Sequence, residues 1–241
     1  MSGKNVKITM IERLLQLVAP HPCYSCGKNG PILCDYCKFN IINDRFYGCV
    51  LCGAPNSSGV CAYHNTNIAL ASVVGSREDA LKTLIDRLKF HNTKAIAYIL
   101  AELLHETLPQ YSKDTVVVPI PTVRQHIRER GYDHLQLMAN HFAMLRGLPC
   151  RNLLVRQTRS VQHTAKSKEE RLVQAQAAFR RTHRTLDHDS DGADDTDNRR
   201  SKNVLIIDDI ITTGSTITNA AKLFDDADAV FVAALAYQPL D

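Results

Sequence analysis

Seven of the eight cysteines fall within one short stretch of the chain, and their spacing is that of metal ligands. They form pairs two residues apart, and a histidine takes the last place: Cys23, Cys26, Cys34, Cys37, Cys49, Cys52, Cys61 and His64. A two-residue spacer lets both thiolates of one turn reach the same ion, and two such pairs complete a tetrahedral Zn²⁺ shell. We therefore expect one or two structural zinc ions. Sequential pairing of the ligands fits the spacing, and interleaved pairing is the alternative.

A second group of chemically useful residues follows the apolar segment 204–207. Two carboxylates come first, and then a hydroxyl-rich turn: Asp208, Asp209, Thr212, Thr213, Gly214, Ser215 and Thr216. The backbone N–H groups of such a turn, the helix that follows it and the hydroxyls all bind phosphate oxygens. The carboxylates would repel phosphate, but they accept hydrogen bonds from vicinal sugar hydroxyls, with Mg²⁺ nearby. The combination predicts a site for a 5-phosphorylated ribose, and simple helix capping is the alternative.

Charge is divided unevenly along the chain, although the formal net charge is only +4. Residues 122–186 hold 13 Lys and Arg against 4 Asp and Glu, a local charge of +9. This basic part predicts a polyanionic partner, either a polyphosphorylated small molecule or a nucleic acid. Arg124, Arg128 and Arg130 cluster in it, and guanidinium groups match phosphate oxygens. A solvated basic face is the alternative.

Three regions must position these groups. Residues 1–20 are expected to hold an amphipathic helix at 9–18. Residues 21–66 are expected to form a zinc-ribbon module, because they hold too few periodic apolar residues for a core of their own. Residues 67–241 alternate strands, predicted at 68–74, 115–120, 153–155, 204–207 and 229–236, with helices, predicted at 78–90, 94–108, 133–146, 168–177 and 215–224. The alternation predicts an α/β fold with a mostly parallel sheet covered on both faces, interrupted at 187–200 by a disordered acidic insertion.

Length and composition exclude several classes of protein. With 241 residues, 44% of them hydrophobic and 22% charged, the chain is neither wholly disordered nor a rod, and it can bury a core without disulfides. We find no apolar run of about 18 residues and no export signal, and we therefore expect a cytoplasmic protein with no membrane insertion. The eighth cysteine, Cys150, is expected to be a small buried hydrophobe.

The order of motifs along the chain resembles the ComF family, which comprises the competence protein and GntX-type members. The resemblance covers nearly the whole chain: the cysteine module, 88–91 (LKFH), 118–121 (VPIP), 128–133 (RERGYD), Arg156 with Arg159 and Gln162, and the acidic–hydroxyl turn. The turn is similar to the phosphoribosyl-pyrophosphate (PRPP) motif of type I phosphoribosyltransferases. The resemblance implies the type I phosphoribosyltransferase fold, a parallel sheet with flanking helices and a hood.

The resemblance also implies roles for the residues named above. Asp208 and Asp209 would bind the ribose hydroxyls of PRPP with Mg²⁺, and 212–216 would hold the 5-phosphate. The turn after 119–121 would face pyrophosphate, where Arg124, Arg128 and Arg130 stand. Lys89 either reaches the pyrophosphate as well or is an exposed lysine at a helix end.

Two further segments follow from the resemblance. Gln162, His163 and Lys166 are candidates for a loop that closes over PRPP, and an ordinary surface loop is the alternative. The chain departs from the family at Asp133 and His134, where Asn and then Gln are usual. Asp133 would bring a negative charge beside a phosphate site unless it caps the helix that starts there.

Two functions from different classes are consistent with these features. One is phosphoribosyl transfer from Mg²⁺-bound PRPP to an acceptor in nucleotide-related metabolism, and no residue stands out as its general base. The other is binding of single-stranded DNA in DNA uptake and transformation, beside competence or recombination proteins, with the pocket kept as a relic or sensor. Tyr132, Phe142 and Phe179 are the few aromatics of the basic segment, which weakens base stacking there. A PRPP sensor without catalysis is the third hypothesis.

Overall fold

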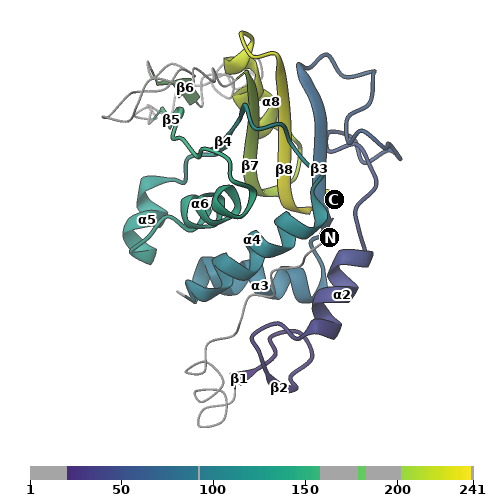
Figure 1. The fold of residues 1–241 in the computed structure, drawn as a ribbon, viewed down its shortest axis with the longest axis vertical. Coiled ribbons are helices and arrows are strands. Elements are labelled where there is room, and N and C mark those ends of the chain that lie inside the picture. Colours follow the sequence, from purple (N-terminus) through teal and green to yellow (C-terminus); the bar gives the residue numbers. More distant parts are fainter. Residues whose placement is uncertain (1–20, 92, 158–178, 183–201, 240–241) are drawn as a thin grey trace, which may run out of the picture.

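A four-stranded parallel sheet organises the part of the chain that the structure describes, which is residues 21–91, 93–157, 179–182 and 202–239 of a computed structural model (Figure 1). Its strands are β3 (Ile68–Ser76), β4 (Thr115–Pro119), β7 (Asn203–Ile211) and β8 (Ala229–Tyr237), in the order β3-β8-β7-β4. Every pairing between them is parallel. The inner strands are apolar on both faces, and Ile206, Ile207, Val232 and Ala233 are fully buried. Such continuous apolar strands are typical of a parallel sheet that is covered on both sides.

The path of the chain through the sheet reverses between β4 and β7. From β3 the chain crosses to β4, and Cys150 then forms a parallel bridge with Val117 of β4. From β7 it steps back inward to its neighbour β8. Because parallel crossovers are right-handed, outward and inward connections lie on opposite faces of the sheet. The segments that leave the carboxyl ends of β4 and β7 therefore diverge, and a crevice is expected between them.

Helices that bury one apolar face pack on this sheet. They are α3 (Asp79–Phe90), α4 (Ala95–Thr107), α6 (His134–Arg146) and α8 (Ser215–Ala221), with a short 3₁₀ turn, η1 (Lys222–Phe224), after α8. Figure 1 shows α3, α4 and α6 grouped together on one side of the sheet. A further helix, α5 (Arg124–Arg130), buries none of its residues and ends at Gly131, whose φ is 77°.

The N-terminal cysteine-rich segment packs on the edge of this assembly. It holds the short antiparallel strands β1 (His21–Pro22) and β2 (Asn29–Gly30) and the helix α2 (Asp35–Asn43). Lys38 of α2 forms an ion pair with Glu106 of α4 at 2.6 Å. The ring of Phe46 stacks on Tyr237 of β8 with ring centroids 4.3 Å apart. A second antiparallel pair, β5 (Leu154–Arg156) and β6 (Phe179–Arg181), forms a small separate sheet.

The expected α/β fold with a parallel sheet is confirmed. The strand predicted at 204–207 runs on to Ile211, because β7 stays paired with β8 through Asp208, Ile210 and Ile211. The helices α2 and α5 were not predicted, since neither shows an apolar stripe in the sequence. The helices predicted at 9–18 and 168–177 and the acidic insertion at 187–200 lie outside the described residues. Within the described ranges, none of the helices is long and apolar enough to cross a membrane.

Candidate functional site

A cavity of about 700 Å³ lies at the expected crevice between the ends of β4 and β7. Its wall combines the segment after β4 (120–123), the end of β7 (208–210) and residues from α3, α5, α6 and α8. Its charged and imidazole side chains are Lys89, His126, Glu129, Arg130, His134, Arg156, Asp208 and Asp209. The reversal of the chain path thus gathers cations and carboxylates that stand far apart in the sequence.

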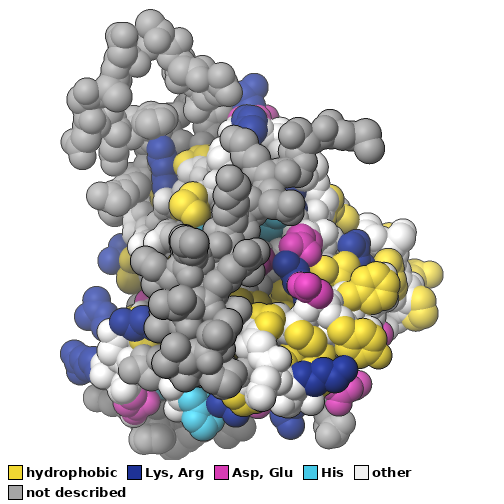
Figure 2. Space-filling view, turned by 60° about the horizontal axis from the view of Figure 1, so that its bottom comes forward, with side chains coloured by type: hydrophobic (Ala, Val, Ile, Leu, Met, Phe, Trp, Pro, Cys, Tyr) yellow, Lys and Arg dark blue, Asp and Glu magenta, His cyan; other side chains and the backbone are white. Residues whose placement is uncertain are grey.

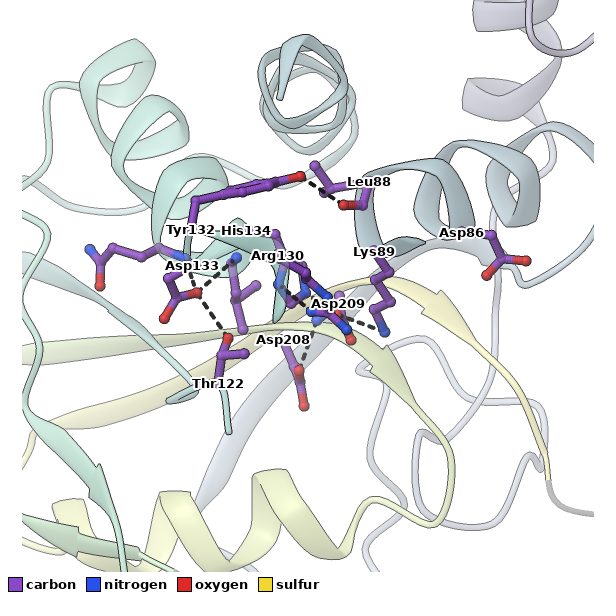
Figure 3. A network of polar contacts seen from close by, with 12 residues as sticks. Asp86, Leu88, Lys89, Thr122, Arg130, Tyr132, Asp133, His134, Asp208 and Asp209 are labelled. Atoms are coloured by element: carbon purple, nitrogen blue, oxygen red, sulfur yellow. Dashed lines mark hydrogen bonds and ion pairs between the residues drawn. The ribbon is translucent and has the colours of Figure 1, made fainter. Parts of the chain in front are cut away.

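Asp209 is the centre of a polar network in this cavity. Its Oδ2 lies 2.8 Å from Nζ of Lys89 and 2.8 Å from Nε2 of His134 (Figure 3). Burial alone would raise the pKa of Asp209, but the hydrogen bond from His134 and the charge of Lys89 outweigh it and lower the pKa to about 2. Asp209 is therefore a fixed carboxylate at neutral pH, already held by a cation in the ligand-free protein.

Arg130 determines which nitrogen of His134 carries the hydrogen. Nη1 of Arg130 lies 3.0 Å from Nδ1 of His134. A guanidinium group can only donate, so Nδ1 is the acceptor and Nε2 carries the hydrogen that it donates to Asp209. The side chain of His134 is only 5% exposed. The chain Arg130–His134–Asp209, with the buried imidazole at its centre, therefore holds the carboxylate in one orientation.

Asp208 differs from its neighbour in its protonation. It is 9% exposed, and its Oδ1 accepts a hydrogen bond from the backbone N–H of Asp209 at 2.8 Å. Burial, together with repulsion from Asp209, raises the pKa of Asp208 to about 7. Near neutral pH the pair therefore carries between one and two negative charges, and a ligand that donates hydrogen bonds or a cation would favour the second ionisation.

Three cations from different elements surround the acidic pair: Lys89 at the end of α3, Arg130 of α5 and Arg156 of β5. Nε of Arg156 donates to the carbonyl oxygen of Pro121 at 3.3 Å, which ties β5 to the segment after β4. Of the three arginines predicted to face pyrophosphate, Arg130 lines this cavity. Arg124 instead lines an adjoining cavity of about 230 Å³, which shares residues 120–123 and Arg156 with the main one, and Arg128 is exposed on α5. The cationic wall therefore differs in part from the predicted one.

The hydroxyl-rich turn adjoins the cavity through Thr216, which lines it. Thr213 and Ser215 are exposed, and the hydroxyl of Thr213 donates to Oγ of Ser215 at 2.9 Å. Gly214 has a φ of 70°, a left-handed conformation that favours glycine. Thr212 is half-buried where β7 ends and the turn begins. Carboxylates and hydroxyls thus follow one another along the end of β7 and the start of α8.

Asp133 caps α6 at the position where the family usually has Asn. Its Oδ1 accepts hydrogen bonds from the backbone N–H groups of Leu135 and Gln136, each at 3.1 Å. The hydroxyl of Thr122 donates to the same oxygen at 2.8 Å (Figure 3). The charge of Asp133 is thus neutralised in part by donors of the protein, as is typical of a helix N-cap.

The metal-ligand candidates assemble into two groups in sequential order. In each group, all ligand atoms lie within 4.8 Å of one another: Cys23, Cys26, Cys34 and Cys37, and then Cys49, Cys52, Cys61 and His64. Burial would raise the pKa of the Cys49 thiol, but backbone N–H groups, that of Cys61 first, outweigh burial and lower the pKa to about 6. Nε2 of His64 is buried and has no hydrogen-bond partner, as expected of a ligand atom. Both donor sets fit a tetrahedral metal ion.

Sequence reasoning did not assign His134 and Arg156 to the site, and it also missed the cavity residues His126 and Glu129. His134 drew notice only as a departure from the family, and Arg156 only as part of a motif. The signal that could have found them is that each is a basic residue in or beside a family motif. No local pattern shows that His134 is buried against a carboxylate 75 residues away. The predicted loop residues Gln162, His163 and Lys166 lie outside the described residues.

Comparisons with known proteins agree with this geometry. A family model described as "Phosphoribosyl transferase domain" matches residues 86–239, which include the whole cavity wall. "Competence protein F" of Haemophilus influenzae is 26% identical over 208 residues, which cover 82% of this chain and 85% of that protein. "Competence protein ComFC" of Bacillus subtilis is 26% identical over 204 residues, which cover 79% of this chain and 76% of that protein. The chain therefore belongs to the phosphoribosyl transferase domain family, as a ComF-like protein with two N-terminal cysteine clusters.

Proposed function

We propose that the cavity binds PRPP together with Mg²⁺. The observation that carries the proposal is the order of groups around one crevice: the hydroxyl turn, then the acidic pair, then the cations. PRPP has the same order of groups, because its ribose stands between a 5-phosphate and a pyrophosphate. The family match supports a ligand of this type.

In this proposal the ribose lies against Asp208 and Asp209. Asp209 accepts a hydrogen bond from one ribose hydroxyl, and the chain from Arg130 through His134 has already oriented its oxygens. The ribose hydroxyls compete with Lys89 for Asp209, so binding frees the ammonium group to turn to the pyrophosphate. Mg²⁺ supplies a further positive charge to the pyrophosphate and favours the ionised form of Asp208.

The phosphates lie at the two ends of the site. The turn 212–216 offers hydroxyl and backbone N–H donors to the 5-phosphate, with Thr216 at the edge of the cavity. Arg130 and Arg156 face the pyrophosphate, where guanidinium groups can donate to two oxygens at once. If transfer follows, the C1–oxygen bond breaks, pyrophosphate leaves with the electron pair, and an acceptor nucleophile bonds to C1. The cations would stabilise the charge that develops on the leaving group.

Isothermal titration with PRPP and Mg²⁺ tests the proposal. We expect binding by the wild-type chain and its loss in Asp209→Asn, because the neutral amide presents an N–H group where the ribose hydroxyl donates. Asp225→Asn is the control. This substitution removes the same charge, but at an exposed residue in the turn after η1. Equal affinities in all three proteins would contradict the proposed site. Pyrophosphate release with candidate acceptors then separates an enzyme from a PRPP sensor.

We also propose that each cysteine cluster holds one Zn²⁺ in a structural role. All four ligand positions come from the protein in each group, which is typical of closed structural sites rather than catalytic ones. Metal analysis of the purified chain is expected to give two zinc ions per chain, and one in Cys26→Ala or Cys52→Ala. A wild-type value near zero after purification without chelator would contradict this assignment.

Single-stranded DNA binding is the second candidate function, and one observation favours it. Four of the large exposed hydrophobic side chains are aromatic and belong to the cysteine-rich segment: Tyr36, Phe39, Tyr47 and Tyr63. Figure 2 shows hydrophobic side chains gathered on one side of the face drawn, among charged side chains of both signs. Exposed aromatics are stacking platforms for unpaired bases. The names of the two relatives, both competence proteins, suit this role.

Fluorescence anisotropy with a labelled oligonucleotide tests this second function. We expect affinity that falls steeply with salt and that weakens in Tyr63→Ala, because Tyr63 is 97% exposed. Asp209→Asn should leave DNA affinity unchanged. DNA affinity lost in Asp209→Asn but kept in Tyr63→Ala would place the DNA in the cavity and contradict a surface on the cysteine-rich segment.

A further inference from the structure

The second cysteine cluster, which comprises Cys49, Cys52, Cys61 and His64, touches the hydroxyl-rich turn 212–216 directly, and we call this segment the phosphate turn. Val50 and Leu51 stand between the ligands Cys49 and Cys52, and they lie against Gly214 in the middle of the turn. A Cβ atom added to Gly214 would lie 2.2 Å from Cδ2 of Leu51 and 3.1 Å from the carbonyl oxygen of Val50. The two segments are therefore in close contact, with no room for a side chain between them.

The position of Val50 and Leu51 is fixed by the cluster itself. The backbone N–H of Leu51 points at Sγ of Cys49 at 3.4 Å, and so does that of Cys61. The N–H of Val50 donates to the carbonyl oxygen of Gly59 at 2.8 Å. Such bonds to sulfur hold a thiolate in the orientation that a metal ion needs. We call residues 49–52 the second knuckle.

The sheet also contacts the residues on either side of the second knuckle. The N–H of Ala71 in β3 donates to the carbonyl oxygen of Ser58 at 3.0 Å, between the ligands Cys52 and Cys61. Tyr237 at the end of β8 stacks on Phe46, just before the knuckle. The segments that flank the knuckle are therefore tied to the sheet, and Leu51 faces the turn.

The first cluster makes its contacts elsewhere. Tyr24, beside the ligand Cys23, packs under the guanidinium group of Arg87 in α3, with 4.0 Å from that group to the ring centroid. Lys38, beside Cys37, pairs with Glu106 of α4. The first cluster thus braces helices, whereas the second braces the segment to which we assign the 5-phosphate.

We propose that the metal ion held by Cys49, Cys52, Cys61 and His64 is a positioning element of the phosphate site. With the ion in place, the second knuckle covers Gly214 and keeps the turn in its binding conformation. Without it, Val50 and Leu51 lose their fixed position and the turn samples other conformations. This inference rests on the proposed function for its ligand, but the contact between knuckle and turn can be tested without any ligand.

The two clusters provide a matched pair of variants. Cys26 and Cys52 are both exposed, and each is the second member of the first pair in its cluster. Cys26→Ala and Cys52→Ala should each lower the zinc content by one ion per chain. Amide hydrogen exchange of the peptide 212–217, measured without ligand, should accelerate in Cys52→Ala and stay at the wild-type rate in Cys26→Ala.

The same pair is then titrated with PRPP and Mg²⁺. We expect affinity about tenfold weaker in Cys52→Ala, the change produced when the competent conformation falls to about one molecule in ten. Wild-type exchange at 212–217 in a Cys52→Ala protein that has lost an ion would overturn the inference. Absence of PRPP binding by the wild type would refute the proposed function instead, and the exchange result would still stand.

Leu51→Ala decides the matter if Cys52→Ala does not fold. This variant keeps all four ligands and should retain two zinc ions, while it removes the side chain that covers Gly214. We expect faster exchange at 212–217 with unchanged exchange in β7. Wild-type exchange throughout Leu51→Ala would show that the knuckle does not hold the turn, and would overturn the inference.

Discussion

Replacement of Gly214 by alanine has two separable costs. The first is backbone strain, because Gly214 has a φ of 70°, where an L-residue costs about 1 kcal/mol. The second is steric, because the new Cβ would lie 2.2 Å from Leu51 and 3.1 Å from the carbonyl oxygen of Val50. Overpacking costs about 1–3 kcal/mol in a closed core, and the low end applies here because Cδ2 of Leu51 is the end of a partly exposed side chain that can move. We therefore expect the free energy of unfolding to fall by about 2 kcal/mol in Gly214→Ala.

Gly131 provides the control for the strain alone. Its φ is 77°, and a Cβ added there would meet nothing within 4 Å. Gly131→Ala should therefore cost about 1 kcal/mol. Urea unfolding followed by circular dichroism gives both values, and their difference measures the contact between the turn and the second knuckle. Equal costs at the two glycines would refute the contact.

The double variant Gly214→Ala with Leu51→Ala completes the test. Removal of the Leu51 side chain opens the space that the new methyl group needs, so the two changes should cost less together than the sum of their separate costs. Residues in contact commonly show coupling of about 0.5–3 kcal/mol in such cycles. Strict additivity would mean that the two side chains do not meet.

Three further outcomes are expected. Asp133→Ala removes the cap of α6 and should lower the free energy of unfolding by about 1 kcal/mol, measured by urea unfolding. Because the pKa of Asp208 is raised from 3.8 to about 7, its protonation favours the folded state below about pH 4, and this contribution is lost as the pH rises through 7. The free energy of unfolding of the wild type, relative to that of Asp208→Asn, should therefore fall from about pH 4 to about pH 7, whereas a constant difference between the two proteins across that range would contradict the shift. Chelation of the metal ions should lower the melting temperature in a calorimetric scan, since metal binding is coupled to folding of such clusters.

The sheet and the acidic–hydroxyl segment could be predicted because their signals are local. The apolar run from Val204 to Ile207 predicts a buried strand, and Asp208 and Asp209 directly after it predict polar chemistry at the strand's end. The two-residue spacing of the cysteines predicts ligand pairs for the same reason. In each case the residues that carry the signal are close neighbours in the chain.

The rest of the site depends on contacts between distant parts of the chain. His134 meets Asp209, and Lys89 meets the same oxygen from the end of α3, 120 residues before it in the chain. The contact of Leu51 with Gly214 joins the cysteine-rich segment to the phosphate turn. No spacing rule within either segment encodes such meetings, because the path of the chain through the sheet creates them. Residues that are close in sequence can also separate in the fold. Arg124 and Arg128 stand near Arg130 in the chain, but they do not line the cavity that Arg130 lines.

A crystal structure of the zinc-loaded chain with Mg²⁺ and PRPP tests the central claim most directly. We predict the 5-phosphate on the turn 212–216, the ribose hydroxyls on Asp208 and Asp209, and Lys89 moved away from Asp209 toward the pyrophosphate. PRPP bound elsewhere on the chain, or an Asp209 that still pairs with Lys89 while the ligand is bound, would contradict the account.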